Sequence, residues 1–174
     1  MIVILDRDGV INHDSPDFIK SPDEWIPING SMEAIALFTH HGYQVYVATN
    51  QSGVGRGIIN EDLLGEIHQK MLSMIQDAGG ALAGIVYCPH HPNRNCQCRK
   101  PRPGLLHRIE RMSGVAITGQ PFVGDSPRDI QAAQAANCEP VLVLTGNGQS
   151  THIRHPDIPA FKDLLTYAEY KISL

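Results

Sequence analysis

The sequence has no long hydrophobic run. None of its uninterrupted apolar stretches approaches the roughly 20 residues that a membrane-spanning helix needs. The N-terminus also lacks a basic region, and the apolar run that begins at Ile2 is too short for a secretory signal. We therefore expect a cytoplasmic protein that does not associate with a membrane.

The sequence also lacks an excess of positive charge. Its formal net charge of −4 argues against a protein that binds nucleic acid through bulk charge. Basic residues nevertheless gather between positions 94 and 111, where Glu110 is the only acid. A local basic patch suits a small anionic ligand better than a long polyanion, and a solvated run of charges is the ordinary alternative.

No internal repeat and no Walker-type glycine loop is present, and the length suits one domain spanning residues 1–174. Apolar runs that predict buried strands alternate with segments of helical periodicity. Strands are expected at 2–5, 45–48, 85–87, 122–123 and 141–144. Helices are expected at 31–41 with Ser31 as the N-cap, from the Asn60 cap to Gly79, and at 103–112, 130–136 and 161–170. This alternation is typical of a doubly wound, mainly parallel, Rossmann-like α/β sheet.

Three loops separate these elements, at 12–27, 53–57 and 146–148. The first is long and polar, and it follows the first strand, where loops commonly carry function or cover a site. Trp25, Ile26 and Ile28 are expected to pin its far end to the body of the domain.

Polar side chains stand at or after the ends of four predicted strands. They are Asp6 and Asp8, Thr49 and Asn50, Lys100 after its loop, and Asp125. Because the carboxyl ends of parallel strands share one edge of a sheet, we expect these groups to converge. Carboxylates from two strands suit Mg²⁺ together with phosphate and water, and this set predicts phosphoryl transfer. An ordinary surface turn is the alternative for the stretch at Asp6 to Gly9.

A cysteine cluster follows the third predicted strand. Cys88, His90, Cys96 and Cys98 offer three sulfurs and an imidazole within eleven residues. In a cytoplasmic protein such a cluster indicates a metal site in preference to disulfides, and this donor set suits tetrahedral Zn²⁺. His91 could replace His90, and two buried cysteines beside a surface histidine pair remain the alternative.

The order Asp6-x-Asp8-Gly9, then Thr49, then Lys100, then Gly124-Asp125-x-x-x-Asp129 resembles the four motifs of the haloacid dehalogenase superfamily. The resemblance implies that Asp6 is a nucleophile forming an aspartyl-phosphate and that Asp8 is the acid and base. It places the phosphoryl oxygens on Thr49, the Asn50 backbone and Lys100. Mg²⁺ would bind Asp6, the Asp8 carbonyl and Asp125.

Two further points follow from the same resemblance. Asp129 would either order its loop or cap the next helix. The segments at 10–31 and 49–60 are too short for the superfamily's large cap domains. We therefore expect an open site.

The residues of the cysteine cluster make the family resemblance more specific. Cys88-Pro-His90-His-Pro with Cys96-x-Cys98-Arg99-Lys100-Pro101 is similar to the loop of the D-glycero-D-manno-heptose 1,7-bisphosphate 7-phosphatases. This family implies removal of the C7 phosphate during biosynthesis of nucleotide-activated heptose for lipopolysaccharide core or surface glycans. A structural zinc ion would fix the loop that presents Arg99 and Lys100. Arg99 would bind the second phosphate, and the sugar pocket would be lined by Asp14, Gln51 and Ser52.

Other functions stay open at this point. Histidinol-phosphate phosphatases of histidine biosynthesis carry a similar zinc loop, and the short segment at 92–95 and Ser126 depart from some heptose relatives. A zinc-stabilised phosphosugar-binding module would not need Asp8. A nucleic-acid end phosphatase would use the basic patch. We expect a monomer that acts on a small phosphorylated sugar and not on nucleic acid, with the preferred anomer, and hence the nucleotide-sugar pathway, undetermined.

Overall fold

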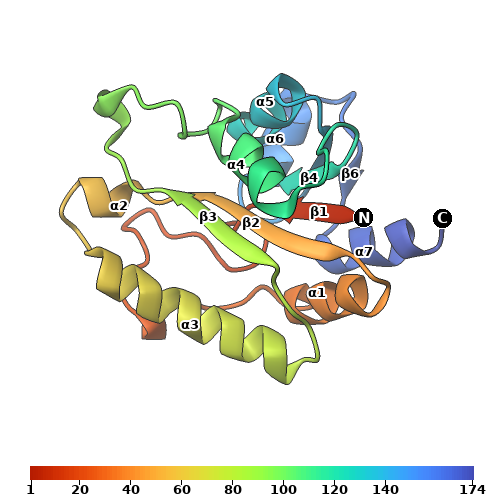
Figure 1. Ribbon diagram of the computed structural model, residues 1–174, viewed down its shortest axis with the longest axis horizontal. Helices are drawn as coiled ribbons and strands as arrows, with labels where there is room; N and C mark the ends of the chain where they lie inside the picture. Colours follow the sequence, from red (N-terminus) through yellow and green to blue (C-terminus); the bar gives the residue numbers. More distant parts are fainter.

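The computed structural model describes residues 1–174, and a parallel sheet runs through its centre (Figure 1). The six strands lie in the order β3-β2-β1-β4-β5-β6, and every neighbouring pair is parallel. They are β1 (Ile2–Leu5), β2 (Gln44–Asn50), β3 (Gly84–Cys88), β4 (Pro121–Gly124), β5 (Glu139–Val143) and β6 (Ala160–Phe161). The predicted doubly wound sheet is confirmed, with one strand more than expected.

Helices cover both faces of the sheet. They are α1 (Ser31–His40), α2 (Ser52–Gly55), α3 (Glu61–Asp77), α4 (Gly104–Ser113), α5 (Pro127–Ala135), α6 (Gly148–Arg154) and α7 (Leu164–Ile172), with 3₁₀ turns at Pro22–Glu24 and Pro92–Arg94. Figure 1 shows α1, α3 and α7 on one side and α4 and α5 on the other. None of these helices combines the length and apolar character required to cross a bilayer.

The central strand β1 is buried on both faces, as its uninterrupted apolar sequence predicts. Alternate side chains point to opposite faces, so Val3 and Leu5 join the core under α1, α3 and α7. Ile2 and Ile4 join the second core, under α4 and α5. Each such side chain contributes about 1.5–3 kcal/mol on burial, which fixes the strand that carries Asp6 at its end.

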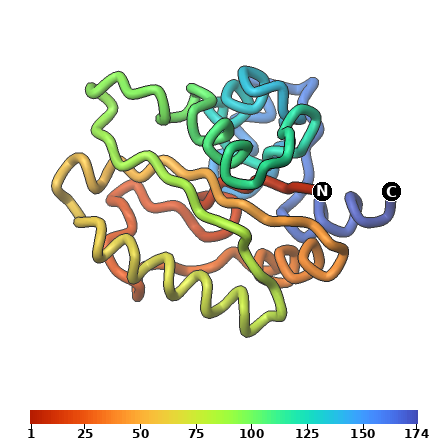
Figure 2. Tube along the Cα trace, in the orientation of Figure 1, coloured from red at the N-terminus to blue at the C-terminus, as the bar shows by residue number.

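The sheet changes winding direction at β1. From β1 the chain proceeds to β2 and β3 on one side, and β4, β5 and β6 follow on the other. Ligands of such sheets bind outside the carboxyl ends of the strands at this switch point. Figure 2 shows both chain termini at the opposite end of the molecule from the loop that follows β3. The site therefore lies at the carboxyl ends of the strands, on the side of the molecule that carries the loop after β3.

Two predictions about the first loop and helix were wrong. Gly30, with a φ of 83°, occupies the N-cap of α1, and Ser31 is the first helical residue. The Ser31 hydroxyl instead donates to the carbonyls of Ile11 and Ile28, which ties the loop to the helix. Trp25 is fully buried as expected, but Ile26 is 56% exposed and does not pin the loop.

Differences also occur in short elements that carry little periodicity. The glycine-rich stretch after β2 contains the four-residue helix α2, and the expected loop at 146–148 leads directly into α6. The last helix begins at Leu164 because the Asp163 carboxylate accepts from the Thr166 N–H and caps it. The residues before Asp163 form β6 instead of the expected first turn.

Candidate active site

A polar cavity of about 280 Å³ opens at the carboxyl ends of β1, β2 and β4. Phe18 and Ile19 are its only apolar lining residues. Gly9 turns the chain beneath it with a φ of +84°, and a side chain there would collide with the Asp125 carboxylate. Glycine is needed at this position because it accepts the positive φ and allows the close approach.

Lys100 lies at the bottom of the cavity and is 2% exposed. Its ammonium is 2.8 Å from a carboxylate oxygen of Asp6 and 2.8 Å from one of Asp129. It also donates to the Ala48 carbonyl at 2.9 Å. Burial disfavours the charged ammonium, but the two carboxylates outweigh it and raise the Lys100 pKa. Lys100 is therefore a fixed positive charge beside Asp6.

Three carboxylates surround this single ammonium. Oxygens of Asp6, Asp125 and Asp129 all lie within 4.8 Å of one another. Burial and the Asp129 charge raise the pKa of Asp6 well above its ordinary value and that of Asp125 to about 6. The cluster is thus short of positive charge. A hard divalent cation such as Mg²⁺ fits this donor set, since it binds carboxylate oxygen and compensates the charge.

The structure assigns Asp129 both of the tasks that the sequence left open. One of its oxygens accepts from the backbone N–H groups of Asp125 and Ser126, at 3.2 and 3.0 Å, and from the Ser126 hydroxyl at 2.7 Å. The carboxylate therefore orders the loop and completes a capping box on α5. Its ion pair with Lys100 lowers the Asp129 pKa despite burial.

Asp8 lies outside the carboxylate cluster and has partners of its own. Arg7 reaches one Asp8 oxygen at 2.9 Å, and Asn12 donates to the same oxygen at 2.9 Å. Gln51 donates to the second oxygen at 2.8 Å and also to the Thr49 hydroxyl at 2.9 Å. Burial would raise the Asp8 pKa, but these donors together lower it. The pKa values of the two motif carboxylates are therefore shifted in opposite directions.

The end of β2 binds the loop that carries Lys100. The Asn50 side chain accepts from the Lys100 N–H at 3.0 Å and donates to the Lys100 carbonyl at 3.1 Å. These two bonds fix the Asn50 side chain against the Lys100 backbone. Thr49, 1% exposed, stands beside it at the cavity wall.

Three arginines reach the outer part of the cavity: Arg56, Arg99 and Arg128. Burial, followed by repulsion from Arg128 and Arg56, lowers the pKa of Arg99. The Arg99 Nη1 atom is buried and has no hydrogen-bond partner. Such a cluster of like charges with an unsatisfied donor is suited to an anion. Asp14 lines the same cavity. Burial and the nearby Asp8 charge raise the pKa of its carboxyl group.

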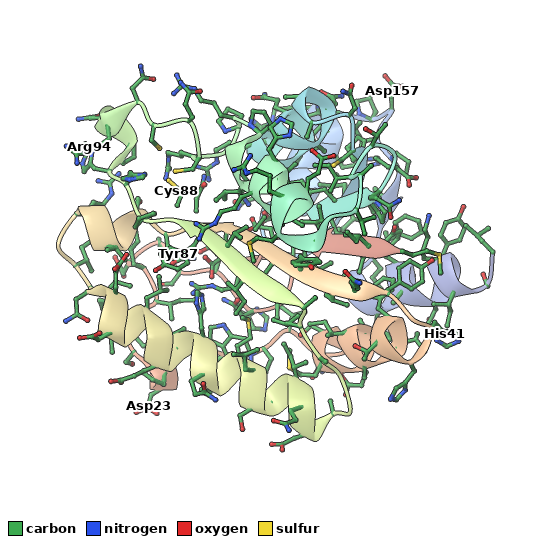
Figure 3. The ribbon with its side chains drawn as sticks, viewed as in Figure 1. Asp23, His41, Tyr87, Cys88, Arg94 and Asp157 are labelled. Atoms are coloured by element: carbon green, nitrogen blue, oxygen red, sulfur yellow. The ribbon has the colours of Figure 1, made fainter.

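The cysteine cluster begins at Cys88, the last residue of β3, which Figure 3 labels on the same side of the molecule as Arg94. The Cys88–Cys96 and Cys96–Cys98 Sγ atoms are 3.5 Å apart, and His90 Nδ1 is 3.5 Å from Cys88 and 3.2 Å from Cys98. A tetrahedron with Zn–S bonds of about 2.3 Å has edges of about 3.8 Å. The four donors therefore fit zinc.

His91 does not take part in this cluster. Its Nδ1 accepts from the Asn93 N–H at 3.1 Å and caps the short turn Pro92–Arg94. Arg102 braces the same loop through the carbonyls of Asn95 and Cys96, at 2.7 and 2.6 Å. His90, and not His91, is therefore the histidine of the cysteine cluster.

Known proteins resemble the chain over almost its whole length. Residues 97–166 match the HAD-hydrolase-like family model. The D-glycero-beta-D-manno-heptose-1,7-bisphosphate 7-phosphatase of Neisseria meningitidis serogroup A is 47% identical over 97% of this chain and 93% of its own. The enzyme of the same name from Pseudomonas aeruginosa is 51% identical over 86% of this chain and 84% of its own. The chain belongs to this phosphatase family.

A solved structure of the heptose bisphosphate phosphatase family supports the same conclusion. The crystal structure of the Bordetella bronchiseptica D,D-heptose 1,7-bisphosphate phosphatase, complexed with magnesium and phosphate, matches with a TM-score of 0.94 at 46% identity. The match covers 99% of this chain and 98% of that one. As a family member, the chain is a phosphoric monoester hydrolase with the haloacid dehalogenase fold and no large cap domain.

The fold of this family member gathers every residue predicted for the phosphoryl and sugar pocket. The cavity is lined by Asp6, Asp8, Asp14, Thr49, Asn50, Gln51, Ser52, Arg99, Lys100 and Asp125. Of the predicted basic patch between positions 94 and 111, only Arg99 and Lys100 line the cavity. Arg102 instead donates to the Cys96 carbonyl in the loop of the cysteine cluster.

Sequence reasoning missed several residues at the site. Arg56 follows Ser52 by four positions, and its Nε donates to the Ser52 hydroxyl at 3.3 Å. Arg128 lies in the first turn of α5, three residues after Asp125. Both could have been suspected from their distance along the chain to a motif residue. Asn147, which donates to Asp125 at 2.8 and 3.1 Å, carries no such signal.

Replacing Cys96 by serine should remove most of the bound zinc and lower the melting temperature, because metal binding and loop folding are coupled. Zinc per chain and thermal unfolding are the measurements. Cys138→Ser is the matched control, since Cys138 is buried against the Ile117 carbonyl, outside the cluster. An unchanged zinc content in Cys96→Ser would contradict the assignment.

Stabilisation by Mg²⁺ should depend on pH. The folded-state pKa of Asp125, about 6, lies above its ordinary 3.8, so its contribution to stability is present in acid and lost as pH rises through about 6. A bound cation would reverse this penalty once the carboxylate is ionised. The Mg²⁺-induced rise in melting temperature should be larger at about pH 7.5 than at about pH 5. Asp125→Asn should lose most of this rise, and equal rises at both pH values would argue against Asp125 as a ligand.

Proposed function

We propose that this enzyme removes the C7 phosphate of D-glycero-β-D-manno-heptose 1,7-bisphosphate, in a biosynthetic route to nucleotide-activated heptose. The observation that carries the proposal is the match over 99% of the chain to a D,D-heptose 1,7-bisphosphate phosphatase crystallised with magnesium and phosphate. The β anomer is proposed because the Neisseria and Pseudomonas relatives are both named for it. The activity is proposed to reside in a single domain.

Asp6 is proposed as the nucleophile. Its carboxylate attacks phosphorus, the bond to the sugar oxygen breaks, and an aspartyl-phosphate forms, which divides one difficult hydrolysis into two steps. Lys100, 2.8 Å from Asp6, is placed to neutralise the phosphoryl oxygens together with Thr49 and the Asn50 backbone. A bound Mg²⁺ on Asp6, the Asp8 carbonyl and Asp125 supplies the positive charge that the cluster lacks.

Asp8 is proposed as the acid and base. In the first step its proton goes to the departing sugar oxygen, and in the second it accepts a proton from the water that attacks the aspartyl-phosphate. Its lowered pKa suits the second role. Arrival of an anionic phosphate opposes the negative form of Asp8 and favours the protonated form needed for the first role.

The second phosphate of the substrate is proposed to bind Arg56, Arg99 and Arg128, which we call the rim arginines. The buried, unsatisfied Nη1 atom of Arg99 supports this placement, since guanidinium groups bind phosphate bidentately. Asp14 and Ser52 line the same cavity and are proposed to contact the sugar. The zinc ion is proposed to have a structural role in holding Arg99 and Lys100 in place.

The rim arginines also discriminate against histidinol phosphate. That substrate has one phosphate, which the Asp6 site would take, and it presents a cationic amine to the rest of the cavity. The guanidinium groups of Arg56, Arg99 and Arg128 would then repel it and remain without an anion. A bisphosphate is therefore the better electrostatic partner.

Phosphate release with Mg²⁺ from both anomers of the heptose bisphosphate and from histidinol phosphate tests the substrate. We expect kcat/KM for the β-heptose bisphosphate to exceed that for histidinol phosphate at least about a hundredfold, which corresponds to roughly 2.7 kcal/mol. Arg99→Gln should raise KM for the bisphosphate and leave KM for a sugar monophosphate nearly unchanged. A preference for histidinol phosphate would move the enzyme to a different pathway and overturn the proposal.

Asp6→Asn tests the mechanism. The amide removes the nucleophile, so kcat should fall at least about a thousandfold. The melting temperature should not fall, since burial and the Asp129 charge disfavour an ionised Asp6 in the metal-free protein. Asp77→Asn, at an exposed position on α3, is the matched control. Activity of Asp6→Asn near the wild-type level would exclude the nucleophilic role.

A further inference from the structure

Arg7 stands between the two motif aspartates, and nothing in the proposed chemistry uses its side chain. It is 1% exposed, and an arginine is rarely buried to this extent unless its charge is paired. Its Nε and Nη2 atoms donate to one Asp8 oxygen at 3.0 and 2.9 Å, and Nη2 also approaches the other oxygen at 3.2 Å. The guanidinium therefore lies along Asp8 and sets the plane of that carboxylate.

The remaining edge of the guanidinium is held by a residue from another element. Arg7 Nη1 lies 3.2 Å from Nε2 of His68, 61 positions along the chain in α3. Arginine has only donors, so His68 Nε2 must accept, and the imidazole proton must be on Nδ1. Burial, and then the Arg7 charge, lower the His68 pKa to about 4, which keeps the ring neutral.

His68 is out of place in the apolar stripe of α3. The other buried residues of this helix are Leu64, Ile67, Met71 and Ile75. His68 is 7% exposed, and its ring packs against that of Tyr87 with centroids 6.0 Å apart. A polar ring within a buried stripe needs a partner, and the Arg7 guanidinium is its only hydrogen-bond partner.

We propose that His68 is a positioning residue for the acid–base step: by accepting from Arg7 it fixes the guanidinium that orients Asp8. The inference rests on the proposed role of Asp8. Without the anchor, one buried N–H of Arg7 has no partner, and the side chain can turn to find one. Asp8 would then keep Asn12 and Gln51 as donors. It would lose the fixed Arg7 guanidinium, which orients the carboxyl group and therefore its proton.

The step affected is the cleavage of the bond between phosphorus and the sugar oxygen. The electron pair of this bond passes to the oxygen, which takes the Asp8 proton and leaves as an alcohol. An alkoxide leaves poorly without that proton, whereas a nitrophenolate is stable without it. Misplacement of Asp8 should therefore slow formation of the aspartyl-phosphate from alkyl esters much more than from aryl esters.

The experiment compares wild type, His68→Leu and His68→Gln on the heptose bisphosphate and on p-nitrophenyl phosphate, through kcat/KM. We expect His68→Leu to lose at least about tenfold on the sugar ester and less than about twofold on the aryl ester. His68→Gln keeps an acceptor for Arg7 and should recover most of the loss. Equal losses on both esters would show a merely structural role, and the absence of any loss would also overturn the proposal.

A second measurement needs no variant. The ¹⁵N NMR shifts of the His68 ring in the wild-type enzyme should show a neutral imidazole with the proton on Nδ1 and an unprotonated Nε2. A proton on Nε2 would contradict the bond to Arg7 whatever the variants do. Wild-type enzyme that hydrolyses neither ester would instead refute the proposed function, so the two failures are distinguishable.

Discussion

The ammonium of Lys100 is the charge on which the site depends. It pairs with Asp6 from the end of β1 and with Asp129 from the start of α5, each at 2.8 Å. Removing this ammonium would leave the buried Asp129 carboxylate uncompensated, and such a loss typically costs about 3–5 kcal/mol. A single side chain therefore joins two neighbouring strand ends and a loop that lies far from both in sequence.

The loop that supplies Lys100 is restrained on two sides. Asn50 binds both backbone groups of Lys100, and the Cys88–His90–Cys96–Cys98 cluster closes the chain just before it. Both restraints attach the loop to strand ends, because Asn50 is the last residue of β2 and Cys88 is the last residue of β3. The cysteine cluster and the Asn50 amide position Lys100, whereas secondary structure positions the other motif residues. Arg99, next to Lys100, lines the cavity with an unsatisfied Nη1 donor.

The sequence predicted the parts of the site that strands position. A buried apolar run fixes β1, and the parallel sheet brings Asp6, Thr49 and Asp125 to one edge with no further information. It did not predict Arg56, Arg128 or His68, because residues within a helix or at its end reach a site only through tertiary packing. Helix α6 and strand β6 were missed for a related reason, since two to seven residues carry little periodicity.

The absence of a covering domain has a consequence for the fate of the aspartyl-phosphate that we propose at Asp6. In an enzyme with a closing cap, the reacting group can be shielded from solvent and passed to a chosen acceptor. Here the polar cavity at the sheet edge opens directly to water once the sugar has left. Water is then the most abundant acceptor at the phosphorus. The architecture itself favours hydrolysis over phosphoryl transfer to another metabolite, without any residue dedicated to that choice.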